Sequence, residues 1–224
     1  ERVVGIGRGA AARRVEIPRS AVARIPEGLD FGAAAGSAWP SLVARHVLDE
    51  VARVRAGERV FVGSAGGGVG LALVAHARAL GAEVSATAST PARRALLESL
   101  GARIVPADRR AAGLASASAA TATAVPAEGR PTEYDHARDH ARDCGHDFDY
   151  DVVVGADAGP ALHARLASLA PGGRYVDLCP RDRFELGEVG ALRLAANRAY
   201  LAVDCLAALT ANGQAVGARL DAAL

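Results

Sequence analysis

The stretch RVFVGSAGGGVGLALVAHARALGAEVSAT, from Arg59 to Thr87, decides the fold predicted for this chain of 224 residues. It predicts a buried strand over Val60–Val62, a glycine-rich turn over Gly63–Gly70, an apolar helix to about Leu80 and a second strand over Val84–Thr87. Together these elements make one βαβ unit, whose crossover helix begins at the glycines.

A turn of this kind suits a dinucleotide. Glycines let the backbone approach a pyrophosphate, and the helix N-terminus offers N–H groups and the positive end of the helix dipole. The motif is Ala65-x-Gly67-x-x-Gly70 with extra glycines at Gly66 and Gly68, so it departs from a strict GxGxxG. Its place between a predicted strand and a predicted helix favours dinucleotide binding over the alternative, a tight turn that binds nothing.

Composition narrows the class of protein. The length fits one large domain, or one domain with a fragment of another, and half of the residues are hydrophobic. The net charge of +1 argues against a nucleic-acid partner held by a basic surface. Three widely spaced cysteines indicate a reducing cytoplasm, and the lack of a leader pattern or a long apolar run predicts a soluble protein that is not exported or held in a membrane.

Six strands alternating with helices predict an α/β fold with a doubly wound, six-stranded parallel Rossmann sheet. Beyond the central unit, strands are expected over Arg103–Val105, Asp151–Val154, Arg174–Leu178 and Tyr200–Val203. A helix is predicted from Ser41 to Gly57, another from Pro91 to Gly101 and another from Pro160 to Leu169. The connection between the third and fourth strands is far longer than usual, so we interpret residues 107–150 as a surface insertion.

The first 40 residues differ from the rest. They predict short strands over Val3–Ile6 and Arg14–Ile17, too little chain to bury a core alone. We therefore expect two parts: a β-rich remnant of another domain over residues 1–40, and the nucleotide-binding domain over residues 41–224.

The segment after the second strand bears on the choice of cofactor. NAD-binding folds usually carry an acidic residue here for the ribose 2′-hydroxyl, but this chain has Ala88-Ser89-Thr90-Pro91-Ala92-Arg93-Arg94. Hydroxyls followed by two arginines favour a 2′-phosphate, and so NADPH over NADH. The alternative is that Ser89 or Thr90 caps the next helix while the arginines are solvated.

Several motifs together resemble a known family. GSAGGGVGLALVAHARALGAEVSATAS, LLESLGARIV and LASLAPGGRYVDL are similar to the medium-chain dehydrogenase/reductase superfamily, and most like the enoyl reductase domains of modular polyketide synthases. RVVGIGRGA, ARIPEGLDFGAAA, LDEVARVRAGERVFV and NRAYLAVDCLAAL add to this likeness. The resemblance identifies residues 1–40 as a remnant of the GroES-like substrate domain.

The resemblance implies NADPH-dependent reduction of an α,β-unsaturated acyl thioester on an acyl carrier protein, within a larger synthase. It also implies that the nicotinamide lies by Gly155–Asp157 and Cys179. The residues expected to bind the cofactor are Ala65, Gly66, Gly67, Gly68, Val69, Gly70, Ser89, Thr90, Arg93, Arg94, Gly155 and Cys179.

The chain departs from the family where the proton donors are proposed. After strand five the family has a Gly-Lys pair with an Asp two residues beyond the Lys; here Pro180 replaces the Lys, and Asp182 is the retained candidate proton donor. Proline carries no proton to donate. Asp157, where the family often has Asn-Ser nearby, is either an acid near the nicotinamide or a helix cap.

Other interpretations stay open. A non-catalytic reductase-like scaffold in a megasynthase is the main rival, and a stand-alone quinone reductase of the same superfamily is a weaker one. His136, His140 and Cys144 have helical spacing that suits a metal, although a solvated charged helix is the simpler interpretation, and no metal is expected. For His46 and His76, core or surface roles are favoured over catalysis, and an inert buried thiol is favoured for Cys179.

Overall fold

We describe the protein from a computed structural model. It describes residues 1–105, 150–178, 194–211 and 216–223, apart from positions 8, 11, 158 and 195. Most of the insertion expected over residues 107–150 therefore lies outside the described residues, and so do Cys179, Pro180 and Asp182.

The predicted doubly wound sheet is confirmed. Its strands run in the order β5-β4-β3-β6-β7-β8, and every neighbouring pair is parallel. The order reverses between β3 and β6, which makes their carboxyl ends the topological switch point, where such sheets bind ligands. The strands are β3 Arg59–Val62, β4 Glu83–Ala86, β5 Arg103–Ile104, β6 Tyr150–Gly155, β7 Leu169–Asp177 and β8 Ala199–Ala202.

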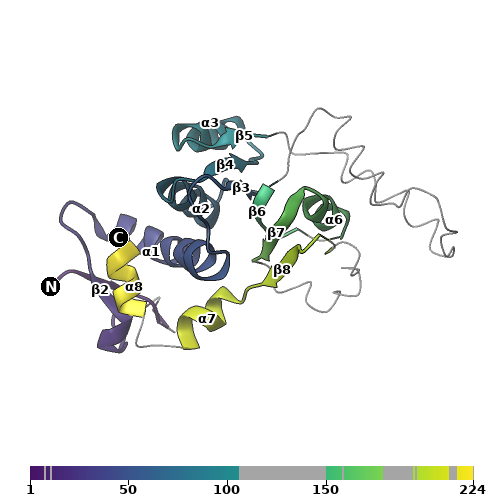
Figure 1. Cartoon of the computed structure of the whole chain (residues 1–224). Helices are drawn as coiled ribbons and strands as arrows, with labels where there is room; N and C mark the ends of the chain where they lie inside the picture. Colours follow the sequence, from purple (N-terminus) through teal and green to yellow (C-terminus); the bar gives the residue numbers. More distant parts are fainter. Residues whose placement is uncertain are drawn as a thin grey trace, which may run out of the picture.

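Helices cover both faces of this sheet (Figure 1). Side chains alternate along a strand, so Val60 and Val62 pack in the core that holds α1 and α2, while Phe61 packs with Leu162 and Leu166 of α6 on the other face. The bounds are α1 Phe31–Arg45, α2 Gly68–Ala79, α3 Pro91–Ser99 and α6 Gly159–Ala167. The sheet is buried on both sides, as parallel sheets usually are.

The helix predicted from Ser41 begins ten residues earlier, at Phe31. Asp30 caps it, because its carboxylate accepts a hydrogen bond from the Ala33 N–H at 2.9 Å. Pro40 lies inside α1, so it does not mark the start of the helix, and its ring faces Gly68 of α2. α1 continues as a π-helical segment, η2, over His46–Val51. α1 crosses residue 40, the expected boundary, and the division into two domains stays a prediction.

The N-terminal part forms a small antiparallel pair, β1 Val3–Gly5 with β2 Val22–Arg24, joined by a short turn of helix, η1 Arg19–Ala21. The strand predicted over Arg14–Ile17 is wrong. Ile17 instead packs its side chain against β1, where an added methyl on Gly5 would meet its Cδ1 at 2.5 Å. Val15, the other apolar residue of this segment, is exposed, and the segment pairs with no strand.

The last described helix, α8 Val216–Ala223, follows α7 Cys205–Ala211 and returns to this N-terminal pair (Figure 1). Gly217 lies so close that an added methyl would meet the Val22 carbonyl oxygen at 2.6 Å. Asp221 accepts the Arg24 N–H at 3.3 Å, and Arg45 of α1 donates to the Ala222 carbonyl at 2.9 Å. Residues from both ends of the chain therefore build one packed corner.

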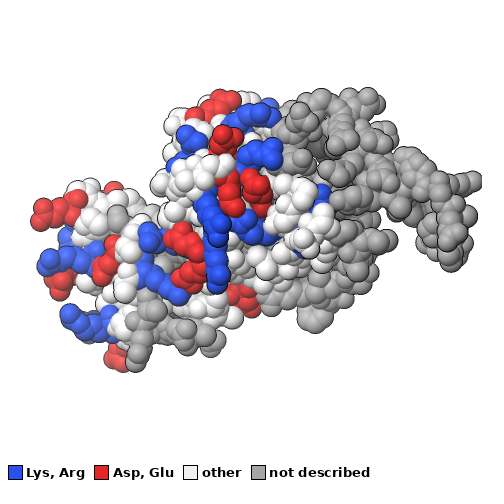
Figure 2. Space-filling view, viewed as in Figure 1, with Lys and Arg blue, Asp and Glu red and all other residues white. Residues whose placement is uncertain are grey.

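Acidic and basic side chains are interspersed on the face shown in Figure 2. Several form pairs, such as Arg174 with Glu58 at 2.8 Å and Arg24 with Glu1 at 3.2 Å. Among the described residues, no helix is both long enough and apolar enough to cross a membrane.

Candidate cofactor site at the switch point

The glycine turn is anchored to both neighbouring strands. The Gly63 N–H donates to the Val154 carbonyl of β6 at 2.9 Å, and the Ala65 N–H donates to the Thr87 carbonyl at 2.8 Å. The Ser64 N–H donates to the Thr87 side-chain hydroxyl at 3.0 Å. The turn therefore lies over the carboxyl ends of β3, β4 and β6, which is the switch point.

Glycine is required at Gly70 because α2 packs directly onto the turn. An added methyl there would lie 2.5 Å from both the Cα and the carbonyl oxygen of Ala65, which is itself fully buried. Gly67, by contrast, caps α2 with no side-chain hydrogen bond, and nothing lies within 4 Å of the methyl it lacks. The first turn of α2 thus offers its N–H groups to an approaching anion, so these residues fit a dinucleotide pyrophosphate.

Gly66 has a different neighbour, the side chain of Arg93. A methyl added to Gly66 would meet the Arg93 Cδ at 2.6 Å and its Cβ and Cγ at 3.2 Å. The aliphatic part of the Arg93 side chain, which comes from α3, therefore lies across the glycine turn at Gly66. The sequence alone did not indicate this contact, which places an exposed guanidinium beside the turn.

The segment Ser89–Arg94 shows one of the two roles considered for it, the helix cap. Thr90 caps α3, accepting the Arg93 N–H at 3.3 Å, so the capping interpretation is confirmed for Thr90. Arg94 turns back and donates from Nε to the Ala88 carbonyl at 3.0 Å. Ser89 is exposed. Phosphate binding by these residues stays a prediction.

Asp157 lies across the switch point. Its Oδ2 is 2.5 Å from where a methyl on Gly155 would be, and 3.6 Å from where one on Gly63 would be, so the carboxylate lies over the ends of β6 and β3. The Tyr175 hydroxyl donates to Asp157 Oδ2 at 3.3 Å, and Arg165 Nε lies 3.8 Å from the same oxygen. The sequence allowed two roles for Asp157, an acid near the nicotinamide or a helix cap. In the structure its carboxylate contacts the Tyr175 hydroxyl and lies near the Arg165 guanidinium.

Burial dominates the electrostatics of this carboxyl. It raises the pKa of Asp157 above the ordinary value, and the nearby charge of Asp177 adds to the rise, while Arg165 and the Tyr175 hydroxyl partly offset it. Burial, with the Asp157 charge beside it, also raises the pKa of Tyr175. Asp157 therefore keeps its proton to a higher pH than an exposed aspartate.

The polar groups around Asp157 were missed by the sequence reasoning. Tyr175 stacks on Tyr200, with ring centroids 5.5 Å apart, and the Tyr200 hydroxyl donates to Asp177. The Arg165 guanidinium lies 4.1 Å from the centre of the Phe61 ring. The sequence did contain a signal for this stacking: each of the last two strands carries a tyrosine, and Tyr175 and Tyr200 are register partners on β7 and β8.

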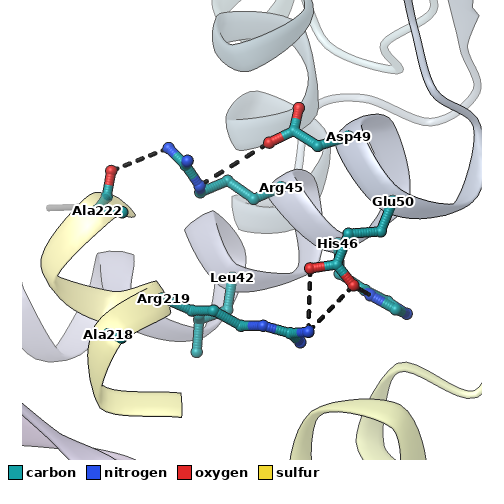
Figure 3. Close-up of a pocket in the computed structure, with 8 residues that line it drawn as sticks. All are labelled: Leu42, Arg45, His46, Asp49, Glu50, Ala218, Arg219 and Ala222. Carbon is teal, nitrogen blue, oxygen red and sulfur yellow. Dashed lines mark hydrogen bonds and ion pairs between the residues drawn. The ribbon is translucent and has the colours of Figure 1, made fainter. Parts of the chain in front are cut away.

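A second cluster lies between α1, η2 and α8 and lines a pocket of about 260 Å³ (Figure 3). His46 Nδ1 is 2.8 Å from Glu50, which also pairs with Arg219 at 3.1 Å. His76 of α2 pairs with Asp49 at 2.8 Å. His76 therefore links α2 to η2, while His46 contacts Glu50 within η2, and Glu50 in turn reaches α8 through Arg219. Core or surface roles for the two histidines stay a prediction.

Two predictions fall outside the described residues: Cys179 with Asp182, and the spacing of His136, His140 and Cys144. Within the described residues, no group of three or more His, Cys, Asp or Glu side chains is arranged to hold a metal ion.

Comparison with proteins of known structure and with family models shows which family this chain belongs to. A solved structure of a putative enoyl reductase domain of a polyketide synthase is 30% identical, covers 79% of this chain and is itself covered to 83%, with a TM-score of 0.54. The chain belongs to the medium-chain dehydrogenase/reductase superfamily, alongside these enoyl reductase domains. The model of the zinc-binding dehydrogenase family matches residues 68–178 of this reductase-like chain.

Curated relatives of this superfamily member are large synthases. A phenolphthiocerol/phthiocerol polyketide synthase polypeptide of Mycobacterium tuberculosis is 31% identical over 204 residues, which is 91% of this chain and 8% of the synthase. Phthioceranic/hydroxyphthioceranic acid synthase of Mycobacterium bovis is 35% identical over 183 residues, 81% of this chain and 7% of that protein. The CurK enoyl reductase has 25% identity and a TM-score of 0.63 over 89% of this chain and 52% of its own. The chain thus spans a small part of these synthases.

Proposed function

We propose that this chain is the enoyl reductase domain of a polyketide synthase, or the nucleotide-binding part of one. Its reaction would be the NADPH-dependent reduction of an α,β-unsaturated acyl thioester carried by an acyl carrier protein. The observation that carries the proposal is the glycine turn crossed by Arg93, in a chain whose relatives include enoyl reductase domains. Neighbouring synthase domains would be its partners.

Each part of the site has a proposed role. The first turn of α2, with Ala65–Gly70 around it, would hold the pyrophosphate through backbone N–H groups. Arg93, with Ser89, Thr90 and Arg94 nearby, would hold the 2′-phosphate, since a guanidinium matches phosphate geometry. Gly155 and Cys179 would border the nicotinamide, and Asp182 would supply the proton. NADPH, when bound, supplies the hydride.

A non-catalytic scaffold is the second candidate, and one specific feature favours it. Pro180 stands where the family has its lysine, and proline cannot donate a proton. In that case the glycine turn would be a structural vestige. The two candidates differ in whether the chain binds NADPH saturably and whether it turns over.

The test is a fluorescence titration of the purified chain with NADPH, followed by turnover with a crotonyl thioester. Saturable binding in the micromolar range, with consumption of NADPH only when the thioester is present, is the result we expect. Saturable binding without consumption would support the scaffold with a vestigial site. Absence of binding up to millimolar NADPH would overturn the reductase proposal.

A further inference from the structure

Asp157 is an acidic group at the switch point of the sheet. Its carboxylate lies over Gly63 and Gly155, one at the end of β3 and the other at the end of β6. Doubly wound sheets bind a dinucleotide as two halves, with the first half of the sheet under the adenosine and the second under the nicotinamide. Asp157 follows β6, the first strand of the second half, so its charge lies at the nicotinamide end.

The surroundings leave this charge only partly balanced. From α6, Arg165 approaches to 3.8 Å, beyond hydrogen-bonding distance, and its side chain stays 23% exposed. From β7, the Tyr175 hydroxyl donates a hydrogen bond, and Asp177 contributes a second negative charge, which accepts a hydrogen bond from Tyr200 of β8. From β3, the neighbour is Gly63, which carries no charge; a methyl added to it would lie 3.6 Å from Asp157 Oδ2. A bound ligand would therefore experience the charge of Asp157 when this residue is ionised.

The two oxidation states of a nicotinamide cofactor differ in just this respect. The oxidised ring carries a positive charge and the reduced ring is neutral, while both forms carry the same phosphates. We propose that Asp157 couples its own ionisation to the oxidation state of the bound cofactor: the carboxylate favours the oxidised form, and the neutral acid favours the reduced form. This inference rests on the proposed cofactor site, and assigns to it a residue that sets the preference between the two forms.

The coupling has a calculable size and sign. A unit charge roughly 8 Å from another, at an effective dielectric constant of about 40, changes an affinity by about threefold to tenfold. As the pH rises and Asp157 loses its proton, the dissociation constant of NADPH divided by that of NADP⁺ should rise by this factor. Burial places the change above the usual aspartate range, because it raises the pKa of Asp157.

The experiment measures both dissociation constants, from about pH 4 to about pH 8.5, for the wild-type chain and for Asp157→Asn. Freshly dissolved NADPH is used at the acid end. Asparagine keeps the shape of the side chain and cannot ionise, so its ratio should stay constant. Because both cofactor forms carry the same 2′-phosphate and pyrophosphate, titration of these groups cancels in the ratio.

Tyr175→Phe provides a second, directional test. Losing the hydroxyl removes a group that lowers the pKa of Asp157, so the pH at which the ratio changes should move upward. A structural role for Tyr175 alone would weaken both forms equally and leave that pH unchanged.

The outcomes separate the inference from the proposed function. If both forms bind and the wild-type ratio is as constant as that of Asp157→Asn, the coupling is overturned while the cofactor site stands. A ratio that differs between the two proteins by the same factor at every pH would also overturn it, because Asp157 would then not titrate. If neither form binds, the cofactor site fails and the inference fails with it.

Discussion

Three glycines of the turn are needed for three different physical reasons. Gly70 admits the close packing of α2 onto Ala65, Gly66 admits the stem of Arg93, and Gly67 has open space around it. The same residue type therefore meets three different needs: close packing of a helix, a contact between two elements, and open space for a ligand to approach. Only the last of these concerns the cofactor directly.

Gly70→Ala tests the packing requirement. The added methyl meets backbone atoms, which cannot move aside like a flexible side chain, so we expect the free energy of unfolding to fall by about 1–3 kcal/mol. The measurement is chemical denaturation followed by circular dichroism. Gly36→Ala is the matched control, since Gly36 lies inside α1 with nothing within 4 Å, and alanine there should raise stability by about 0.5–1 kcal/mol. Equal effects at both positions would contradict the packing argument.

At the scale of elements, one ion pair joins distant parts of the sheet. Glu58, just before β3, accepts two hydrogen bonds from the Arg174 guanidinium of β7, at 3.0 and 2.8 Å. Arg174 also donates to the backbone carbonyls of Ala52 and Arg53, at the end of η2. The same arginine thus ties the entry to β3, the strand β7 and the preceding helix together.

This pair predicts a pH dependence of stability. Burial raises the pKa of Glu58, but the hydrogen bonds and charge of Arg174 and the Arg55 N–H outweigh burial and lower it overall. A depressed carboxyl pKa adds stability above its ordinary value of 4.5, and this contribution is lost as the pH falls through the folded-state value. Glu58→Gln should cost about 1–3 kcal/mol at neutral pH and flatten the acid limb of the stability curve.

The control for this prediction is Glu98→Gln on the exposed side of α3, which should leave the acid limb unchanged. Denaturation midpoints of the three proteins across the acid range measure the difference. An unchanged acid limb in Glu58→Gln would show that the pair contributes nothing to the pH dependence.

The elements differ in how much of them the sequence could predict. The central βαβ unit was predictable because its apolar strands and glycines act locally. The start of α1 was not, because small residues after Asp30 give no helical periodicity and Pro40 resembles a boundary. The cluster of Asp157, Tyr175 and Arg165 was not, because it depends on how β7 and α6 sit beside the end of β6, which only the folded chain determines.

At the scale of the whole molecule, the proposed cofactor site lies where the two halves of one sheet meet, at the switch point. Arg93 crosses the turn on the adenosine side, and Asp157 lies over the strand ends on the nicotinamide side. The α8 corner closes the molecule against β2 at a separate place, where its charged groups pair with one another. The proposed cofactor site and the contact between α8 and β2 therefore lie at separate places in the fold.

The most direct test of the account compares NADPH and NADH affinities for the wild-type chain, Arg93→Ala and Arg93→Gln. Arg93→Gln keeps most of the stem across Gly66 and removes the charge. Wild-type protein should prefer NADPH, and both variants should weaken NADPH by about tenfold or more while changing NADH by less than about twofold, because a charged hydrogen bond to phosphate contributes about 1.5–3 kcal/mol. Equal losses of NADPH and NADH in both variants would contradict a 2′-phosphate site at Arg93.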